Sequence, residues 1–257
     1  MPVFRRDEFA AAFGRQAGDR AVTELLKYHL RAGNVRRIAR GLFARIPKGG
    51  PPAADSADKF LAASRLRLGA IIAYRSALEL HGYCQEAAAM SEVQLIAPGE
   101  PGVIATADFA CRLVSLPNGH SLGDGVTTIE RQGLAVRLTT LEQTLVDLFD
   151  RYSLAGGAED LFRSLEVVAE RAESLDIEAM VDFARQLNNS TASGALGYWL
   201  DHERDRLGVT TASLEELRSL APRHARYALG ARPGRGRAGT GWNVILPAAI
   251  VERYFDD

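Results

Sequence analysis

The pattern of apolar and polar positions is most regular between residues 19 and 47. One helix is predicted first, because apolar residues recur at the spacing of a single buried helical stripe. The stripe consists of Val22, Leu25, Leu26, His29 and Leu30. Asp19 precedes the stripe as a suitable N-cap, and Gly33 followed by Asn34 is a signal that ends a helix.

Two short strands are predicted directly after this helix, at residues 35–38 and 42–46, with a turn at residues 39–41. A hairpin of this length is not stable alone, so it is expected to pack on the helix. A cationic helix followed at once by an arginine-rich hairpin is the layout of a winged helix-turn-helix. In that fold the helix enters the major groove and the hairpin lies beside the phosphate backbone.

The remaining chain reads as alternating helices and strands. Residues 4–13 suggest a short helix with Phe4, Phe9 and Phe13 on its apolar edge. In the middle region, helices are predicted at residues 56–68 and 75–83 and strands at 70–74, 93–97, 111–116, 127–131 and 134–138. Further on, helices are predicted at residues 139–149, 158–172, 176–187, 191–207 and 213–220, a loop at 221–240 and a strand at 242–246.

These elements predict an α+β fold: an N-terminal winged helix-turn-helix, a mixed α/β middle region and a mainly helical C-terminal region. Residues 47–52 (PKGGPP) hold three of the ten prolines and are the clearest boundary signal. We therefore expect domains at residues 1–47, 53–138 and 139–257. A length of 257 residues suits two to three small domains.

Charge is distributed unevenly along the chain. Residues 1–50 hold 11 Lys and Arg against four Asp and Glu, a net charge of +7, whereas the remainder carries −8 and the whole chain −1. A basic head on an acidic body is typical of a nucleic-acid-binding domain attached to a body that does not bind. A solvated amphipathic helix with a purely structural hairpin is the alternative.

Candidate DNA contacts follow from this layout. On the polar face of the helix, Arg20, Thr23 and Lys27 are placed to read base edges, and Arg31 lies on the same face. Arg15 and Gln16, just before the helix, are placed to clamp the DNA backbone. Arg36, Arg37 and Arg40 on the hairpin suit phosphates or the minor groove.

A second basic segment lies near the C-terminus, where no acidic residue occurs between Ser219 and Val251. Its arginines are a possible secondary nucleic-acid contact, and a solvated loop is the equal alternative. They are Arg223, Arg226, Arg232, Arg235 and Arg237. The Gly-x-Gly-x-x-Gly spacing at residues 234–239 is not expected to bind a dinucleotide, because a loop precedes it and a strand follows it.

No other motif predicts chemistry. The five histidines lack H-x-x-x-H spacing, no C-x-x-C or D-x-D occurs, and none of the three lysines lies in an E-x-K sequence. We therefore expect no enzyme, no metal and no cofactor. His81 is expected to be a helix-end histidine bound to the backbone, and Cys84 and Cys111 to be reduced and buried. The absence of an apolar signal core or membrane-length run predicts a cytoplasmic protein.

Three segments resemble the AbiEi antitoxin family, the transcriptional-regulator half of type IV toxin–antitoxin pairs. They are residues 31–44 (RAGNVRRIARGLFA), 73–83 (AYRSALELHGY) and 139–149 (TTLEQTLVDLF), with a weaker likeness at 241–247 (GWNVILP). The family commonly has Pro-Glu-Arg where this chain has Leu141, Glu142 and Gln143. The likeness spans most of the chain, but each segment is short.

The resemblance implies a repressor whose winged helix binds inverted repeats upstream of its own operon and whose larger C-terminal region supports antitoxicity. The implied companion is a nucleotidyltransferase-like toxin encoded next door, and direct contact with it stays open. A pseudo-palindromic site needs two copies on double-stranded DNA, whether the protein is a monomer or a dimer in solution. The alternative is an interaction protein that neutralises a partner through its C-terminal helices without sequence-specific DNA binding.

Overall fold

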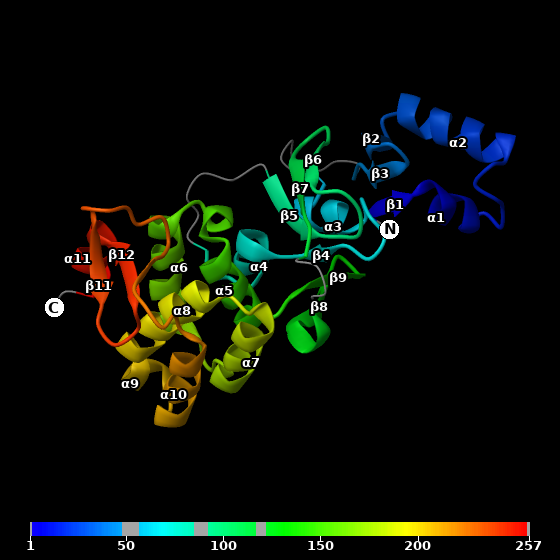
Figure 1. Cartoon of the computed structure of the whole chain (residues 1–257). Helices are drawn as coiled ribbons and strands as arrows, with labels where there is room; N and C mark the ends of the chain where they lie inside the picture. Colours follow the sequence, from blue (N-terminus) through cyan, green and yellow to red (C-terminus); the bar gives the residue numbers. More distant parts are fainter. Residues whose placement is uncertain (1, 48–56, 85–91, 117–121, 256–257) are drawn as a thin grey trace. The chain divides into compact units, whose positions relative to one another are not determined.

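The computed structural model describes residues 2–47, 57–84, 92–116 and 122–255 (Figure 1). The chain divides into two compact units. The N-terminal unit comprises Met1–Ile72, Ala88–Leu116 and Thr127–Leu138, and the C-terminal unit comprises Ala73–Ala87, Pro117–Val126 and Thr139–Asp257. The boundary signal at residues 47–52 lies, from residue 48 on, outside the described residues, and the three-domain division stays a prediction.

A small sheet with two helices opens the N-terminal unit. Its elements are β1 (Val3–Arg5), α1 (Arg6–Ala11), α2 (Arg20–Arg31), β2 (Val35–Ala39) and β3 (Leu42–Arg45), and the strand order is β1-β3-β2 (Figure 1). The strands are antiparallel, and Phe4 on β1 pairs with Phe43 on β3. The helix predicted at residues 4–13 is confirmed over Arg6–Ala11, but its start at residue 4 was wrong, since residues 3–5 pair with the hairpin as a strand. Phe4, Leu26, Val35 and Phe43 form the core of this part.

The helix predicted after Asp19 is confirmed as α2. Val22 and Leu26 are buried, and the other members of the apolar stripe are half-buried. Gly33 has φ +67°, and the Asn34 N–H donates to the carbonyl of His29 at 3.0 Å, so the helix ends as its sequence predicted. Asp19 stands at the N-cap position, but its side chain makes no capping hydrogen bond.

A larger sheet completes the N-terminal unit. Its strands are β4 (Ile71–Ile72), β5 (Glu92–Ile96), β6 (Gly102–Ala105), β7 (Ala110–Val114), β8 (Val126–Arg131) and β9 (Leu134–Thr139), in the order β6-β7-β5-β4-β9-β8. The sheet is mixed, because β5 is parallel to β7 and β4 to β9, whereas β4 and β5 are antiparallel. Helix α3 (Lys59–Ser64) packs against β4 and β5, and the Asp58 carboxylate caps it. All of these strands were predicted except β6.

Helices dominate the C-terminal unit, as predicted. They are α4 (Tyr74–Leu80), α5 (Leu141–Asp150), α6 (Ala158–Arg171), α7 (Ile177–Leu187), α8 (Ser190–His202), α9 (Arg204–Leu207), α10 (Thr211–Leu220), α11 (Ala248–Tyr254) and the 3-10 turns η2 (Gly123–Gly125) and η3 (Tyr152–Ala155). α5 packs against α4, α7 and α8, and its N-cap Thr140 accepts a hydrogen bond from the Gln143 N–H. Phe149, Phe162 and Trp199 fill the core beside it.

A small sheet near the C-terminus replaces much of the predicted loop. Its strands are β10 (Arg226–Tyr227), β11 (Gly236–Gly239) and β12 (Val244–Pro247), in the order β10-β12-β11 (Figure 1). A loop over residues 221–240 was therefore wrong for β10 and β11. Glycine is required at Gly236, because a Cβ there would lie 2.4 Å from Ile245 Cγ2 on β12. A strand and not a helix follows the Gly-x-Gly-x-x-Gly spacing at residues 234–239, so packing between strands explains these glycines.

Candidate nucleic-acid interface

The outer face of α2 gathers the cations expected to touch DNA. Arg20, Lys27 and Arg31 are exposed and fall within an arc of about 40° at 100° per residue. Arg20 and Arg31 make no ion pair or hydrogen bond within the described parts of the chain through their side chains. Both guanidinium groups are therefore available to an anionic partner.

Lys27 is paired, but weakly. Its ammonium group lies 3.0 Å from Glu24 one turn earlier, and both side chains are more than half exposed. An exposed pair at this spacing stabilises a helix by about 0.2–0.5 kcal/mol, so a phosphate competes easily for the lysine. Tyr28, beside it, is 63% exposed and was not singled out from the sequence. The sequence signal that could have identified Tyr28 as a surface residue is an aromatic side chain on the polar side of the helix.

Thr23 holds α2 to α1. Arg6 at the start of α1 donates from Nη2 to Thr23 Oγ1 at 2.6 Å, and the hydroxyl donates to the Asp19 carbonyl at 3.2 Å. The Thr23 hydroxyl thus both donates and accepts a hydrogen bond within the protein. Arg15 and Gln16 are exposed in the link before α2, where the Asp19 N–H donates to the Gln16 carbonyl at 3.1 Å.

The hairpin arginines fall into two environments. Arg37 and Arg40 are exposed; Arg37 Nε lies 3.4 Å from the Ala39 carbonyl, and Arg40 stands at the tip without a side-chain partner in the described ranges. Arg36 is half-buried and donates from Nη1 to the Asp108 carboxylate at 2.5 Å. Arg36 therefore links β2 to the segment before β7 through this ion pair.

The C-terminal arginines are exposed on and around the small sheet. Arg226 is on β10 and Arg237 on β11, the two strands that flank β12, and Arg223, Arg232 and Arg235 lie in the connections. Arg237 pairs with Glu252 on α11 at 3.0 Å. The other four have no side-chain partner in the described chain. This group is cationic and solvated, and its role stays a prediction.

A buried polar cluster in the C-terminal unit was not predicted. Gln143 Nε2 donates to Asp147 Oδ1 at 2.8 Å, and Asp147 Oδ2 is buried with no hydrogen-bond partner among the described residues. Burial raises the pKa of Asp147 to about 7, although the hydrogen bond from Gln143 lowers it. Burial also raises the pKa of Tyr74 well above its ordinary value. Tyr74 has φ +55°, an uncommon conformation for a bulky residue, and its hydroxyl accepts from Arg151 at 3.3 Å.

The other reactive side chains have structural explanations. His81 ends α4 and donates from Nε2 to the Thr139 carbonyl at 2.8 Å, which confirms the predicted backbone bond. Cys111 is buried, and burial raises its thiol pKa to about 12. Cys84 is only half-buried, so its predicted burial was wrong; neither cysteine is in a disulfide. No group of three or more His, Cys, Asp or Glu in the described ranges could hold a metal ion.

Comparison with known proteins does not assign the chain to a family. No family model matches the chain, and no curated protein matches it. Among the described residues, no helix combines the length and apolar character needed to cross a bilayer.

Proposed function

We propose that the chain is a sequence-specific DNA-binding repressor whose α2 is a recognition helix and whose β2–β3 hairpin is a wing. The observation that carries this proposal is the outer face of α2, where Arg20 and Arg31 are exposed and have no side-chain partner among the residues that the structure describes. The order β1-α1-α2-β2-β3 supports it, because a short helix, a second helix and an antiparallel hairpin follow one another as in a winged helix-turn-helix.

The proposed contacts divide by accessibility. Arg20, Lys27 and Arg31 face a groove, while Arg15, Gln16, Arg37 and Arg40 contact phosphates. Thr23 and Arg36 are engaged within the protein and act by positioning α2 and the hairpin. A base contact from an arginine contributes about 1–3 kcal/mol of discrimination, and a phosphate contact contributes to all sequences alike.

The proposed biological role is the antitoxin of a type IV pair that represses its own operon. The sequence resemblance over residues 31–44, 73–83 and 139–149 supports this role. The helical C-terminal unit would supply antitoxicity, and two copies would occupy inverted repeats on the promoter.

The first test is a binding titration on the DNA upstream of the gene and on a scrambled duplex, at two salt concentrations. Wild type is expected to prefer the upstream DNA and to bind it with a steep salt dependence. Arg20→Ala should lose at least tenfold in affinity. Arg206→Ala is the matched control, because Arg206 is an exposed helical arginine with an i,i+3 partner, Glu203, in the other unit. Equal binding by Arg20→Ala, Arg40→Ala and wild type would remove the proposed interface.

A second experiment separates repression from antitoxicity. The Arg20→Ala, Arg31→Ala double variant is co-expressed with the neighbouring toxin gene and with a promoter reporter. Loss of repression with antitoxicity retained supports two separate roles. Retention of both functions supports the alternative, in which the C-terminal helices neutralise a partner directly.

A further inference from the structure

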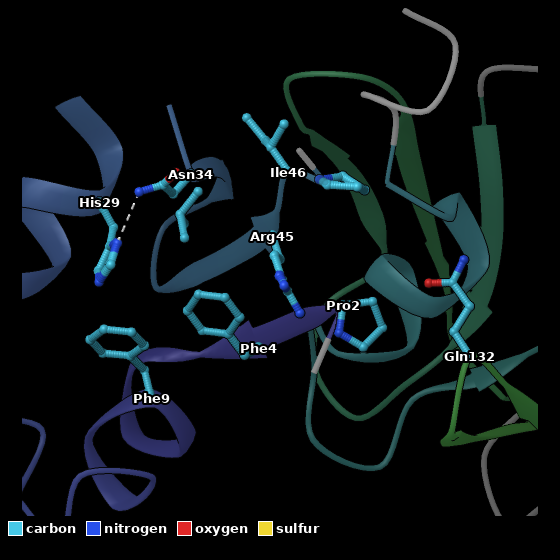
Figure 2. A pocket seen from close by; sticks show the side chains of 10 residues that line it. Pro2, Phe4, Phe9, His29, Asn34, Arg45, Ile46 and Gln132 are labelled. Atoms are coloured by element: carbon cyan, nitrogen blue, oxygen red, sulfur yellow. Dashed lines mark hydrogen bonds between the residues drawn. The ribbon is translucent and has the colours of Figure 1, made fainter. Parts of the chain in front are cut away.

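The N-terminal unit contains a hollow of about 810 Å³ on the inner side of α2 (Figure 2). This hollow, bounded by β1, α1, α2 and the end of β3, is distinct from the proposed DNA face. His29, which forms part of its wall, follows Arg20 by nine positions and so projects about 180° away from it on the helix. Ligand sites commonly have volumes of 300–1,000 Å³ and mostly apolar walls, and this hollow has both properties.

One wall is aromatic. The rings of Phe4 and Phe9 are stacked with centroids 5.5 Å apart and an interplanar angle of 21°. The imidazole of His29 meets Phe9 edge-on, with centroids 6.3 Å apart. Figure 2 shows Phe4 and Phe9 side by side below His29. A flat apolar ring placed here would meet aromatic faces and edges, the arrangements that aromatic pairs favour.

A cation stands beside this wall. Arg45, the last residue of β3, is exposed, and its backbone N–H donates to the Pro2 carbonyl at 2.9 Å. Its guanidinium has no partner within the described ranges, and no described residue lining the hollow is acidic. In Figure 2 the Arg45 side chain extends toward Pro2 beside Phe4. An unpaired guanidinium next to apolar rings is suited to a carboxylate, which it binds through two parallel hydrogen bonds.

Neutral polar groups complete the lining. Asn34 Nδ2 lies 3.4 Å from His29 Nδ1 in a hydrogen bond that joins the loop after α2 to the helix. Gln132, in the turn between β8 and β9, adds an amide on the side away from α2 (Figure 2). The Asn34 and Gln132 amides offer a ligand hydrogen bonds without adding charge, and Arg45 is the arginine among the described lining residues.

From these contacts we propose that the hollow binds a small aromatic carboxylate, with the ring against Phe4 and Phe9 and the carboxylate on Arg45. The proposal concerns binding alone. It does not depend on DNA recognition, because neither wall uses the outer face of α2.

The test is calorimetric titration of the full-length protein with 4-phenylbutyrate, indole-3-acetate and 2-naphthoate, without DNA. At least one of the three should bind saturably, and its neutral carboxamide should bind at least tenfold more weakly, because the amide loses the charge-assisted bonds. Arg45→Gln should weaken the carboxylate by the same tenfold. Arg40→Gln is the matched control, since Arg40 is an exposed arginine of the same hairpin that lies outside the hollow and has no side-chain partner among the described residues.

The result is independent of whether every variant folds. If Arg45→Gln is unfolded by circular dichroism, the comparison of carboxylate with carboxamide on wild type still decides the matter. Equal binding of acid and amide overturns the proposal, and so does equal binding by folded Arg45→Gln and wild type. The absence of saturable binding by all three acids up to 10 mM overturns it as well.

Discussion

Arg36 on β2 and Asp108, which precedes β7, are joined by an ion pair of 2.5 Å although 72 positions separate them in the chain. Beside it, the Ala107 N–H donates to the Ile38 carbonyl at 3.2 Å. Both side chains of the pair are about three-quarters covered, and Arg36 Nε and Nη2 are buried with no hydrogen-bond partner in the part of the chain that the structure describes. One ion pair and one backbone hydrogen bond thus hold the hairpin against the larger sheet of the N-terminal unit.

Removing one half of this pair should destabilise the protein. Asp108→Ala leaves the Arg36 guanidinium half-buried without its anion, and we expect a loss of about 1–3 kcal/mol in the free energy of unfolding. The measurement is denaturant unfolding. Glu24→Ala breaks the exposed pair with Lys27 and should change stability by less than about 0.5 kcal/mol. An equal, small effect of both variants would show that the Arg36 pair contributes nothing.

Asp147 should make stability fall as pH rises. Its folded pKa, about 7, is raised above the unfolded value near 3.9, so the unfolded chain releases the proton first. The destabilisation begins above pH ~4 and is complete above pH ~7, and from pH 5 to 8 it amounts to about 2–3 kcal/mol. Asp147→Asn should flatten this part of the pH profile. A wild-type profile with the same slope as that of the variant would contradict the assignment.

Arg40 should contribute a phosphate contact. Its removal is expected to weaken binding to upstream and scrambled DNA alike and to reduce the slope of log K against log salt by about one unit. The check is a salt titration of Arg40→Ala beside Arg206→Ala, which should keep the wild-type slope. Selective weakening on the upstream DNA would instead place Arg40 at a base edge.

Gly197 in α8 should not tolerate alanine. A Cβ there would lie 2.0 Å from Cζ3 of the buried Trp242, so the helix and the indole would have to separate. Overpacking of this kind costs about 1–3 kcal/mol or more. Gly18→Ala is the control, because that position has open space and no left-handed backbone. Thermal unfolding should show a lower midpoint for Gly197→Ala alone.

Elements with a strong local signal were predictable from the sequence. α2 was found because its apolar stripe has the helical period and Gly33 ends it, and the hairpin was found because residues 39–41 form a turn between β-type runs. β1 was missed because a strand of this length forms only when β3, about forty positions later, pairs with it. β6 was missed because most of it is exposed and lacks alternation.

The residues of the candidate site also divide into those that the sequence could place and those that it could not. Sequence alone placed Arg20, Lys27 and Arg31 on one face, since that follows from helical geometry. It could not distinguish Arg36 from Arg37, because the pairing with Asp108 joins distant segments. The hollow could not be predicted from the sequence either, since its lining residues come from different elements: Phe4, His29, Arg45 and Gln132.

α2 is one continuous helix with Arg20 on one side and His29 on the other. A displacement of its inner surface therefore carries the outer surface with it. If a ligand in the hollow shifts or stiffens this helix, it changes the affinity of the outer face for a polyanion, and the polyanion changes the affinity for the ligand by the same factor. Under the two proposals, ligand binding in the hollow and polyanion binding on the outer face would be reciprocally coupled through one twelve-residue helix.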